Sequence, residues 1–291
     1  MLNFKKIGLA GAVDDHFVEK IVQKIIHLLD ILRISCVIDE RLHTQHKEKK
    51  KLHDMLSEID ILLIVGGDGT FLRIARETFD HNIPIIGIHC GRLGFLTEIH
   101  SDLLYNSFVK IFIEKKYSQE DRLILECHDT EHDSPLLALN DFVITQNDHQ
   151  KMIEFSLSVQ STLVCQQRGD GIIVATPTGS TAYALSAGGP IIDPNLDVQL
   201  IVPMFAHTLN LRPLVFPANE PLSLLCDTQK STASIQVNAD GQEKRLLSSP
   251  HLLHIKKHKQ KINLLHLESY SFYHTLRKKF DWSTQHIQQR K

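Results

Sequence analysis

The sequence has no long hydrophobic run and no closely spaced pair of cysteines. No stretch approaches the roughly 18 consecutive apolar residues that indicate a membrane-spanning helix, so we expect no membrane partner. The five cysteines are odd in number, far apart and without a C-x-x-C pair. This usage is typical of reduced thiols in the cytosol rather than of a disulfide framework. The composition therefore predicts a cytoplasmic protein.

The chain also lacks an excess of charge of either sign. It has 32 Lys and Arg residues against 34 Asp and Glu residues, a formal net charge of -2. Binding to nucleic acid by neutralising phosphates needs a basic excess, so we expect no nucleic-acid partner. Hydrophobic residues make up 42% of the chain and charged residues 23%, which excludes disordered and fibrous classes. A length of 291 residues favours two domains over one.

Apolar runs and amphipathic stretches alternate in the first part of the chain. Strands are expected at 6–10, 34–38, 59–65 and 83–88, and helices at 15–32 and 70–79. This order predicts a doubly wound α/β domain over residues 1–116, a parallel sheet with helices on both faces. Three- and four-residue spacings on the first helix predict one buried stripe: Phe17, Ile21, Ile25, Leu28 and Leu32.

The pattern changes near Tyr117 to short β-type runs separated by turns. They lie at 122–127, 136–145, 153–159, 163–167, 222–225, 233–237, 252–255 and 262–265. We expect a mainly β domain over residues 117–267 and a C-terminal tail, 268–291, that docks back on the N-terminal domain. With no long linker between the domains, a cleft between them is the default ligand site.

The run Gly66-Gly67-Asp68-Gly69-Thr70 follows an apolar strand and precedes a helix. Glycines let the backbone turn sharply and bring N–H groups against a phosphate, which the helix dipole also favours. Asp68 would repel that phosphate unless it holds a metal ion or takes a proton from an attacking hydroxyl group. The run therefore indicates phosphoryl transfer, or else a plain turn in which Asp68 caps the helix.

A second polar stretch extends from Arg168 to Pro190. Hydroxyl side chains crowd a turn within it: Thr176, Thr178, Ser180 and Thr181. Arg168 and Asp170 add opposite charges, and such groups can bind sugar or phosphate oxygens. The alternative is a capped helix start, with Thr178 or Ser180 as the N-cap and Gly188-Gly189-Pro190 as the stop. One cap does not require so many hydroxyl groups, so we favour a binding site.

Asn140 and Asp141 form a polar pair inside an otherwise apolar strand. Burying both without partners would be costly, so the pair predicts a ligand contact, a turn or an internal network of hydrogen bonds. Asp240-Gly241-Gln242 is typical of a hairpin turn. Neither segment alone identifies a function.

Basic and histidine-rich runs carry little information about function. The basic run 47–51 is expected on a solvated helix face, and the lysines of 256–261 are expected in exposed turns. Histidine groups such as His251, His254 and His258 have no carboxylate or cysteine beside them in the sequence. Their spacing would also scatter them over both faces of a strand, so we expect no protein-bound metal.

Several stretches together resemble one family. They are Gly66 to Thr70, Ala138-Leu139-Asn140-Asp141, and residues 169–191 with the core Thr-Pro-Thr-Gly-Ser-Thr-Ala-Tyr. Residues 203–209 and 211–215 fit as well, so the match covers nearly the whole chain in the right order. The sequence resembles the ATP-dependent NAD kinases of the bacterial type.

The resemblance implies a fold, an assembly and a reaction. The fold would be an α/β domain followed by a β-sandwich-like domain, in a homo-oligomer (dimer or tetramer) whose neighbouring subunit helps to build the NAD site. ATP and NAD would be the substrates, with Asp68 as the general base that takes the proton from the 2′-hydroxyl of the adenosine ribose. Mg2+ would enter with ATP, since no Walker-type lysine is present, and no tightly bound cofactor is expected.

The resemblance also implies binding residues. The path of the ATP phosphates would be lined by Gly66, Gly67, Gly69 and Thr70. The NAD site would comprise Asp68, Gly69, Arg73, Asn140, Asp141, Arg168, Asp170, Thr181, Ala182, Tyr183, Ala184, Leu185, Ser186, Ala206 and Gln242. The family often has Glu at the position of Asp141. The shorter side chain implies a ribose contact that is longer, bridged by water or compensated by the backbone.

Two other functions would use the same features. A lipid-type kinase shares the Gly-Gly-Asp-Gly motif, but it would need an apolar cleft for acyl chains and leaves residues 176–186 unexplained. A non-catalytic dinucleotide sensor would keep the pocket and would be indicated by the loss of Asp68. Asp68 is intact, so we expect catalysis.

Overall fold

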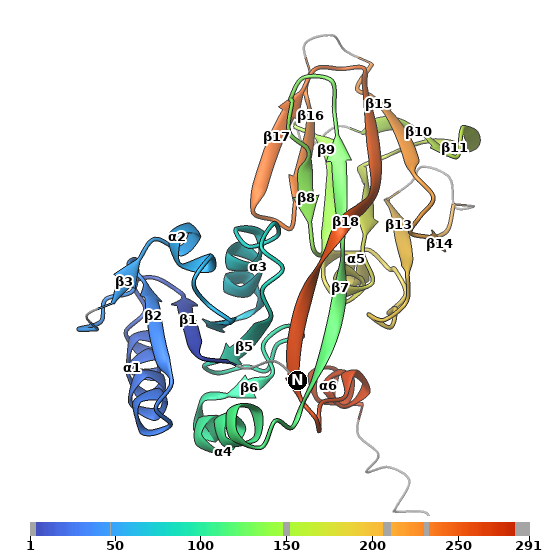
Figure 1. Cartoon of the computed structure of the whole chain (residues 1–291). Coiled ribbons are helices and arrows are strands. Elements are labelled where there is room, and N and C mark those ends of the chain that lie inside the picture. Colours follow the sequence, from blue (N-terminus) through green and yellow to red (C-terminus); the bar gives the residue numbers. More distant parts are fainter. Residues whose placement is uncertain (1–3, 47, 148–151, 206–210, 230–232, 283–291) are drawn as a thin grey trace, which may run out of the picture. The chain divides into compact units, whose positions relative to one another are not determined.

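The computed structural model describes residues 4–46, 48–147, 152–205, 211–229 and 233–282. The chain forms two compact units, a first unit of Met1–Asp121 with Ile262–Lys291 and a second unit of Arg122–Lys261 (Figure 1). It passes from one unit to the other inside two strands, β7 (Tyr117–His128) and β18 (His251–Leu267). None of the helices in the described ranges is long and apolar enough to cross a membrane.

A parallel sheet forms the centre of the first unit. Its strands lie in the order β3-β2-β1-β4-β5, and the last part of β18 pairs with β5 at Leu264 and Ile85. The strands are β1 (Lys6–Gly11), β2 (Ser35–Asp39), β3 (Lys49–Lys50), β4 (Ile61–Val65), β5 (Ile85–His89) and β6 (Ile99–His100). Because these strands are parallel, the turns that follow β4 and β5 lie at the same edge of the sheet.

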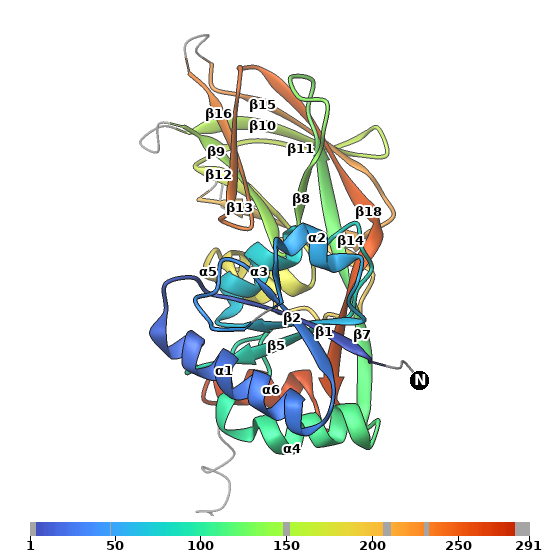
Figure 2. The same cartoon turned by 60° about the vertical axis from the view of Figure 1, so that its left-hand side comes forward.

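Helices cover both faces of this sheet (Figure 2). On one face, α1 (His16–Ile31) and α4 (Leu104–Phe108), which continues as a π-helical turn (Val109–Ile113), share a core with Leu9 and Leu63. On the other face lie α2 (Leu52–Leu56) and α3 (Asp68–Arg76). A 3-10 turn (Ser101–Leu103) and α6 (Phe272–Lys279) complete the unit. The predicted doubly wound α/β fold is confirmed.

The buried stripe of α1 differs from the predicted one. It consists of Val18, Ile21, Val22, Ile25 and Leu29. Phe17 is 55% exposed, and Leu28 and Leu32 are only partly buried, so Phe17 was wrongly predicted as core. The reason is local, since Asp15 is the N-cap and accepts hydrogen bonds from the N–H groups of Phe17 (2.9 Å) and Val18 (3.2 Å). Phe17 therefore lies in the first turn and faces solvent, and Val18 begins the buried stripe.

Two antiparallel sheets build the second unit. One has the order β14-β13-β12-β9-β16-β17, and the other contains β11-β10-β15-β18, with β7 paired to β18 and β8. Their strands are β8 (Leu136–Ala138), β9 (Asp141–Gln146), β10 (Ile153–Val159), β11 (Thr162–Gly169), β12 (Gly171–Ala175), β13 (Val198–Met204), β14 (Leu214–Pro217), β15 (Leu222–Asp227), β16 (Ile235–Ala239) and β17 (Glu243–Leu247). Phe142 and Ile172 of one sheet share a core with Phe155 and Leu224 of the other. The predicted sandwich-like β domain is confirmed.

Two basic segments lie in strands, which corrects the prediction. β18 is continuous through 256–261, where exposed turns were expected. Its side chains alternate, with Leu253 and Ile255 buried and Lys256 exposed, so lysines fit the solvent side of one long strand. Lys49 and Lys50 form β3 beside β2 and not a helix face.

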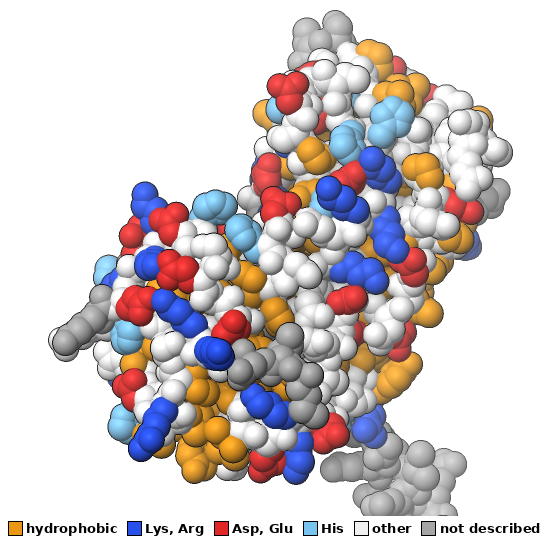
Figure 3. All heavy atoms as spheres, in the orientation of Figure 1, with side chains coloured by type: hydrophobic (Ala, Val, Ile, Leu, Met, Phe, Trp, Pro, Cys, Tyr) orange, Lys and Arg blue, Asp and Glu red, His pale blue; other side chains and the backbone are white. Residues whose placement is uncertain are grey.

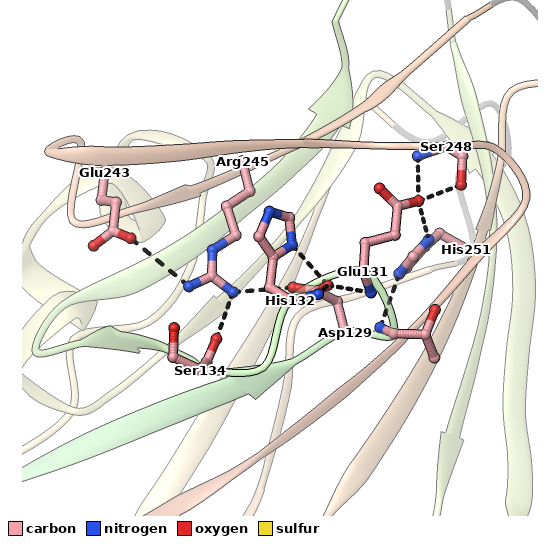
Figure 4. Close-up of polar contacts among 9 residues, drawn as sticks. Asp129, Glu131, His132, Ser134, Glu243, Arg245, Ser248 and His251 are labelled. Carbon is pink, nitrogen blue, oxygen red and sulfur yellow. Dashed lines mark hydrogen bonds and ion pairs between the residues drawn. The ribbon is translucent and has the colours of Figure 1, made fainter.

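Charged side chains fix the loop after β7 to β17 and β18 (Figure 4). Arg245 donates to Asp129 at 3.1 Å and to the carbonyl oxygen of Ser134 at 2.7 Å. Nδ1 of His251 lies 3.3 Å from a carboxylate oxygen of Glu131. Since His251 and Asp129 are both almost fully buried, these contacts make the cluster part of the packed β unit.

Acidic and basic side chains are interspersed on the face drawn in Figure 3. Opposite charges meet in surface pairs such as Lys6 with Glu58 (3.0 Å) and Lys116 with Glu114 (2.9 Å). This mixture agrees with the net charge of -2. The described part of this face therefore offers no continuous positive surface of the kind that nucleic-acid binding requires.

The N-cap of α1 provides a test of the fold. Asp15→Ala should lower the free energy of unfolding of the first unit by about 1 kcal/mol, since two N–H groups lose their acceptor. Urea unfolding can be followed by the fluorescence of the single tryptophan, Trp282, in the same unit. As a control, Lys20→Ala at an exposed position of α1 should change stability by less than about 0.5 kcal/mol. Equal effects of the two variants would reject the capping role.

Candidate functional site

The turn after β4 places Asp68 in the first turn of α3. Gly66 has φ of 155°, and a Cβ there would lie 2.8 Å from Cβ of Thr70, so the turn requires glycine. Gly67 is the N-cap residue and no side chain caps the helix. Cβ atoms built on Gly67 and Gly69 would meet nothing within 4 Å. The start of α3 is therefore open to an approaching anion, which the helix dipole would favour.

The carboxylate of Asp68 is held by another segment, Gly94–Thr97. Oδ2 accepts the N–H of Phe95 at 2.8 Å, and Oδ1 accepts the N–H of Leu96 at 3.1 Å and the hydroxyl of Thr97 at 3.2 Å. A Cβ on Gly94 would collide with Oδ1. The alternative in which Asp68 only caps its own helix is therefore wrong. The sequence prediction missed this segment, because no local pattern links residues so far apart.

Two other side chains of the first unit lie near this turn. His89 ends β5, and its Nδ1 donates to the carbonyl oxygen of Gly91 at 3.0 Å. Burial lowers the pKa of His89 below its ordinary value, so the imidazole is mainly neutral at pH 7. Arg73, a predicted NAD contact, donates to the carbonyl oxygen of Gly11 at 3.2 Å and pairs with Glu77 at 3.5 Å. Arg73 thus ties α3 to β1, and its contact with NAD stays a prediction.

In the second unit, Asp240 fixes the segment that contains Asn140 and Asp141 through hydrogen bonds. Its carboxylate accepts the N–H groups of Leu139 (3.0 Å), Asn140 (2.7 Å) and Asp141 (3.1 Å). Asp240 and Gly241 both have positive φ, 53° and 68°, in the turn between β16 and β17. The predicted hairpin is confirmed, but the turn pattern gave no sign that its aspartate orders a segment about a hundred residues away in sequence.

Several hydroxyl groups of the stretch 176–181 bond to the chain itself. Oγ1 of Thr176 donates to the carbonyl oxygen of Leu139 at 2.5 Å, and Oγ of Ser180 donates to that of Pro177 at 2.6 Å. Thr176 and Ser180 are both fully buried. These two hydroxyl groups therefore stabilise the loop through internal hydrogen bonds. The sequence had suggested instead that they could face a ligand.

The helix start predicted in this stretch takes a different form. A 3-10 turn (Thr178–Thr181) follows Pro177, and α5 (Tyr183–Ser186) follows Ala182 without a side-chain cap. Neither Thr178 nor Ser180 is an N-cap, so that part of the capped-helix alternative is wrong. Gly188 has φ of 87° just after α5, so glycine ends the helix as expected.

A cleft of about 530 Å³ opens in the second unit beside these segments. The predicted residues that line it are Asn140, Asp141, Asp170, Ala182 and Tyr183. Asp240 and Lys244, which the prediction did not include, line it as well. A smaller hollow of about 330 Å³ is lined by Tyr183 and Ser186. The structure thus brings four polar predicted residues of this unit, Asn140, Asp141, Asp170 and Tyr183, around one opening.

Other predicted NAD residues lie away from the cleft lining. Arg168 is exposed on β11 opposite Glu154, and Gln242 is exposed in the hairpin turn. Ala184 is buried in a small apolar cluster, while Thr181 and Leu185 are half-buried. Ala206 lies outside the described residues. Contacts of these residues with a ligand remain predictions.

The carboxyl group of Asp141 is only 3% exposed and has an unusual charge state. Burial, together with the nearby negative charge of Asp240, raises the pKa of Asp141 to about 7. The N–H of Tyr183, which donates to this carboxyl group, opposes the increase. At pH 7 Asp141 is therefore about half protonated. The carboxyl group of Asp141 can then donate as well as accept a hydrogen bond.

Comparison with known protein families gives one consistent result. Residues 18–117 match the family described as the ATP-NAD kinase N-terminal domain, and residues 139–267 match the ATP-NAD kinase C-terminal domain. The chain is 36% identical over 291 residues to the NAD kinase of Ectopseudomonas mendocina, covering 98% of each chain. It is 37% identical over 292 residues to the NAD kinase of Marinobacter nauticus, covering 98% of this chain and 99% of the relative.

Solved structures show the same similarity. An NAD kinase from Archaeoglobus fulgidus in complex with ATP superposes with a TM-score of 0.75 and 25% identity, covering 95% of this chain and 97% of that chain. Yeast NADH kinase in complex with NADH superposes with a TM-score of 0.87 and 19% identity, covering 97% of this chain and 89% of that chain. At this low identity the yeast structure supports the fold alone.

The raised pKa of Asp141 predicts a pH-dependent stability. The native state keeps the proton that an unfolded chain loses near pH 3.8. This stabilising contribution is full below about pH 3.8 and is lost as the pH rises through about 7. The free energy of unfolding of Asp141→Asn, minus that of the wild type, should therefore be larger at pH 8 than at pH 5. Urea unfolding at both pH values measures this difference. Asp133→Asn, at an exposed position, is the control. A constant difference between Asp141→Asn and wild type would contradict the prediction.

Proposed function

This chain belongs to the ATP-NAD kinase family, and on that premise we propose that it transfers the γ-phosphoryl group of ATP to the 2′-hydroxyl of the adenosine ribose of NAD, giving NADP. The observation that carries the proposal is the setting of Asp68. Its carboxylate is fixed by Phe95, Leu96 and Thr97 beside an open helix start. This arrangement suits a base that must stand next to a phosphate group.

Asp68 acts as the general base of the reaction. An alcohol is a weak nucleophile at neutral pH, and a positioned base removes its proton as the oxygen attacks. The O–H bond of the ribose hydroxyl breaks and its proton passes to Asp68. The same oxygen forms a bond to the γ-phosphorus, the bond from that phosphorus to the β-phosphate oxygen breaks, and ADP leaves.

The turn around Asp68 binds the phosphates of ATP. Gly66, Gly67, Gly69 and Thr70 form it, and the accessible N–H groups at the start of α3 suit an anion. Mg2+ arrives as part of the MgATP substrate and offsets the phosphate charge close to Asp68. The similarity to the A. fulgidus enzyme, which was solved with ATP, supports this donor.

The cleft of the second unit binds NAD. Asn140 and Asp141 contact the adenosine part, and Tyr183, whose side chain lines the cleft, packs on a ring. The volume of about 530 Å³ is of the usual size for a small-molecule site. Contacts of NAD with the other residues named from the family resemblance, from Gly69 and Arg73 to Ala206 and Gln242, belong to the same proposal.

The active form is a cytoplasmic homo-oligomer in which Arg168 and Asp170 of a neighbouring subunit reach the dinucleotide. Phe205, at the edge of the cleft, is 81% exposed. An aromatic side chain so exposed beside a binding site suits burial by a second chain. Asp170 also lines the cleft, and its charge beside Phe205 supports a role in binding at such a subunit boundary.

Replacing the base tests the reaction directly. Asp68→Asn should bind NAD like the wild type but form NADP about 100-fold more slowly or worse, since a general base contributes on this scale. NADP is measured with an NADP-specific dehydrogenase after incubation with NAD and MgATP. Turnover at the wild-type rate would remove Asp68 from the mechanism. A wild-type protein that binds NAD but forms no NADP would favour the sensor alternative.

Asp141 should act on binding and not on the chemical step. Asp141→Ala should weaken NAD about tenfold, the usual effect of losing a hydrogen bond to a ligand in a buried site, with a smaller effect on kcat. Isothermal titration of NAD into the variant and the wild type measures the change. Asp133→Ala serves as the matched control on the surface of the same unit. Unchanged affinity in Asp141→Ala would reject the proposed contact.

A further inference from the structure

The segment Gly94–Thr97 fixes Asp68, and its hydrogen bonds fall unequally on the two oxygens of the carboxylate. We propose that this segment positions Asp68 for proton transfer, and that the hydroxyl group of Thr97 directs Oδ2 of Asp68, and not Oδ1, toward the ribose hydroxyl. Thr97 is then a positioning residue that acts through Asp68. The inference rests on the proposed function of Asp68 as the base.

The two oxygens of Asp68 are not equivalent. Oδ1 accepts hydrogen bonds from the N–H of Leu96 and the hydroxyl of Thr97, whereas Oδ2 accepts from the N–H of Phe95. An ionised carboxylate offers about two accepting positions on each oxygen. Among the described residues, Oδ1 therefore has both positions filled and Oδ2 has one left. The remaining position on Oδ2 is the one that can take a proton from the substrate.

The backbone of the segment is fixed on the side of the sheet. The N–H of Glu98 donates to the carbonyl oxygen of Gly87 in β5 at 3.1 Å. A Cβ on Gly87 would lie 2.7 Å from Cα of Thr97 and collide with the carbonyl oxygen of Leu96. The segment thus lies directly against a glycine of the sheet, and Thr97 is fully buried. The backbone that carries its hydroxyl group is therefore held against β5.

The C-terminal helix supports the segment from the other side. The ring of Phe95 lies 6.2 Å from that of Phe272 and 6.0 Å from that of Phe280, centroid to centroid. The ammonium group of Lys279 lies 5.3 Å from the centre of the Phe95 ring. The residue that donates to Oδ2 is therefore packed by α6, which belongs to the same unit. Both oxygens of Asp68 are held by donors whose own positions are fixed.

The proposal predicts a specific kinetic change for Thr97→Val, which keeps the shape of the side chain and removes the hydroxyl group. The kcat for NADP formation should fall about tenfold, since a hydrogen bond to a charged group is lost. KM for NAD and for MgATP should stay within about twofold, because the cleft and the glycine turn are unchanged. Thr97→Ser keeps the hydroxyl group and should retain most of the wild-type kcat. Thr97→Ala also removes the hydroxyl group but adds no methyl group in its place, and it should show the same fall in kcat.

Two further measurements separate positioning from general destabilisation. Thr78→Val removes another buried hydroxyl of the first unit, which donates to the carbonyl oxygen of Ala75 at 2.7 Å, and should leave kcat unchanged. In an Asp68→Asn background, Thr97→Val should cause little additional loss, because the two residues act as one unit. A wild-type kcat in both Thr97→Val and Thr97→Ala, or a full additional loss in the Asp68→Asn background, would overturn the proposal. Failure of the wild type to form NADP would instead reject the proposed function.

Discussion

The binding of a carboxylate by backbone N–H groups of a distant segment is the interaction on which the candidate site residues of each unit depend. Asp68 is held in this way by Phe95 and Leu96, and Asp240 by Leu139, Asn140 and Asp141. Hydrogen bonds to a charged acceptor are stronger than neutral ones and fix its direction. In each case one aspartate connects a turn to a segment that the local sequence does not bring near it.

The two aspartates have different consequences because their surroundings differ. Asp68 stands at an open helix start, where an anion can approach and where a base is required. Asp240 is nearly buried beside Asp141, so its charge and the loss of solvent keep Asp141 partly protonated near neutral pH. This favours the proposed binding of a negatively charged dinucleotide in the cleft, since a neutral Asp141 repels it less than a second carboxylate would.

The fold was largely predictable, and the supports of the site were not. Apolar runs such as Ile61–Val65 predict buried parallel strands because such strands are covered on both faces. Phe17 was misassigned because spacing alone does not show where a capped helix begins. Asp68 stood out as a carboxylate in a glycine-rich turn that suits a phosphate, and Asn140-Asp141 stood out as a polar pair in an apolar strand. The roles of Asp240 and of Gly94–Thr97 could not be predicted from the sequence, since their partners lie far away in sequence and contact them only in the folded chain.

The central claim is that Asp68 removes the proton of the ribose hydroxyl during phosphoryl transfer. The most direct measurement is a single-turnover experiment with γ-32P-ATP, Mg2+ and NAD, using the full chain and Asp68→Asn at concentrations that saturate both with NAD. The account predicts that label appears in the 2′-phosphate of NADP with the wild type, and about 100-fold more slowly with the variant. Equal rates of transfer in the two proteins, or label in any product other than NADP, would contradict it.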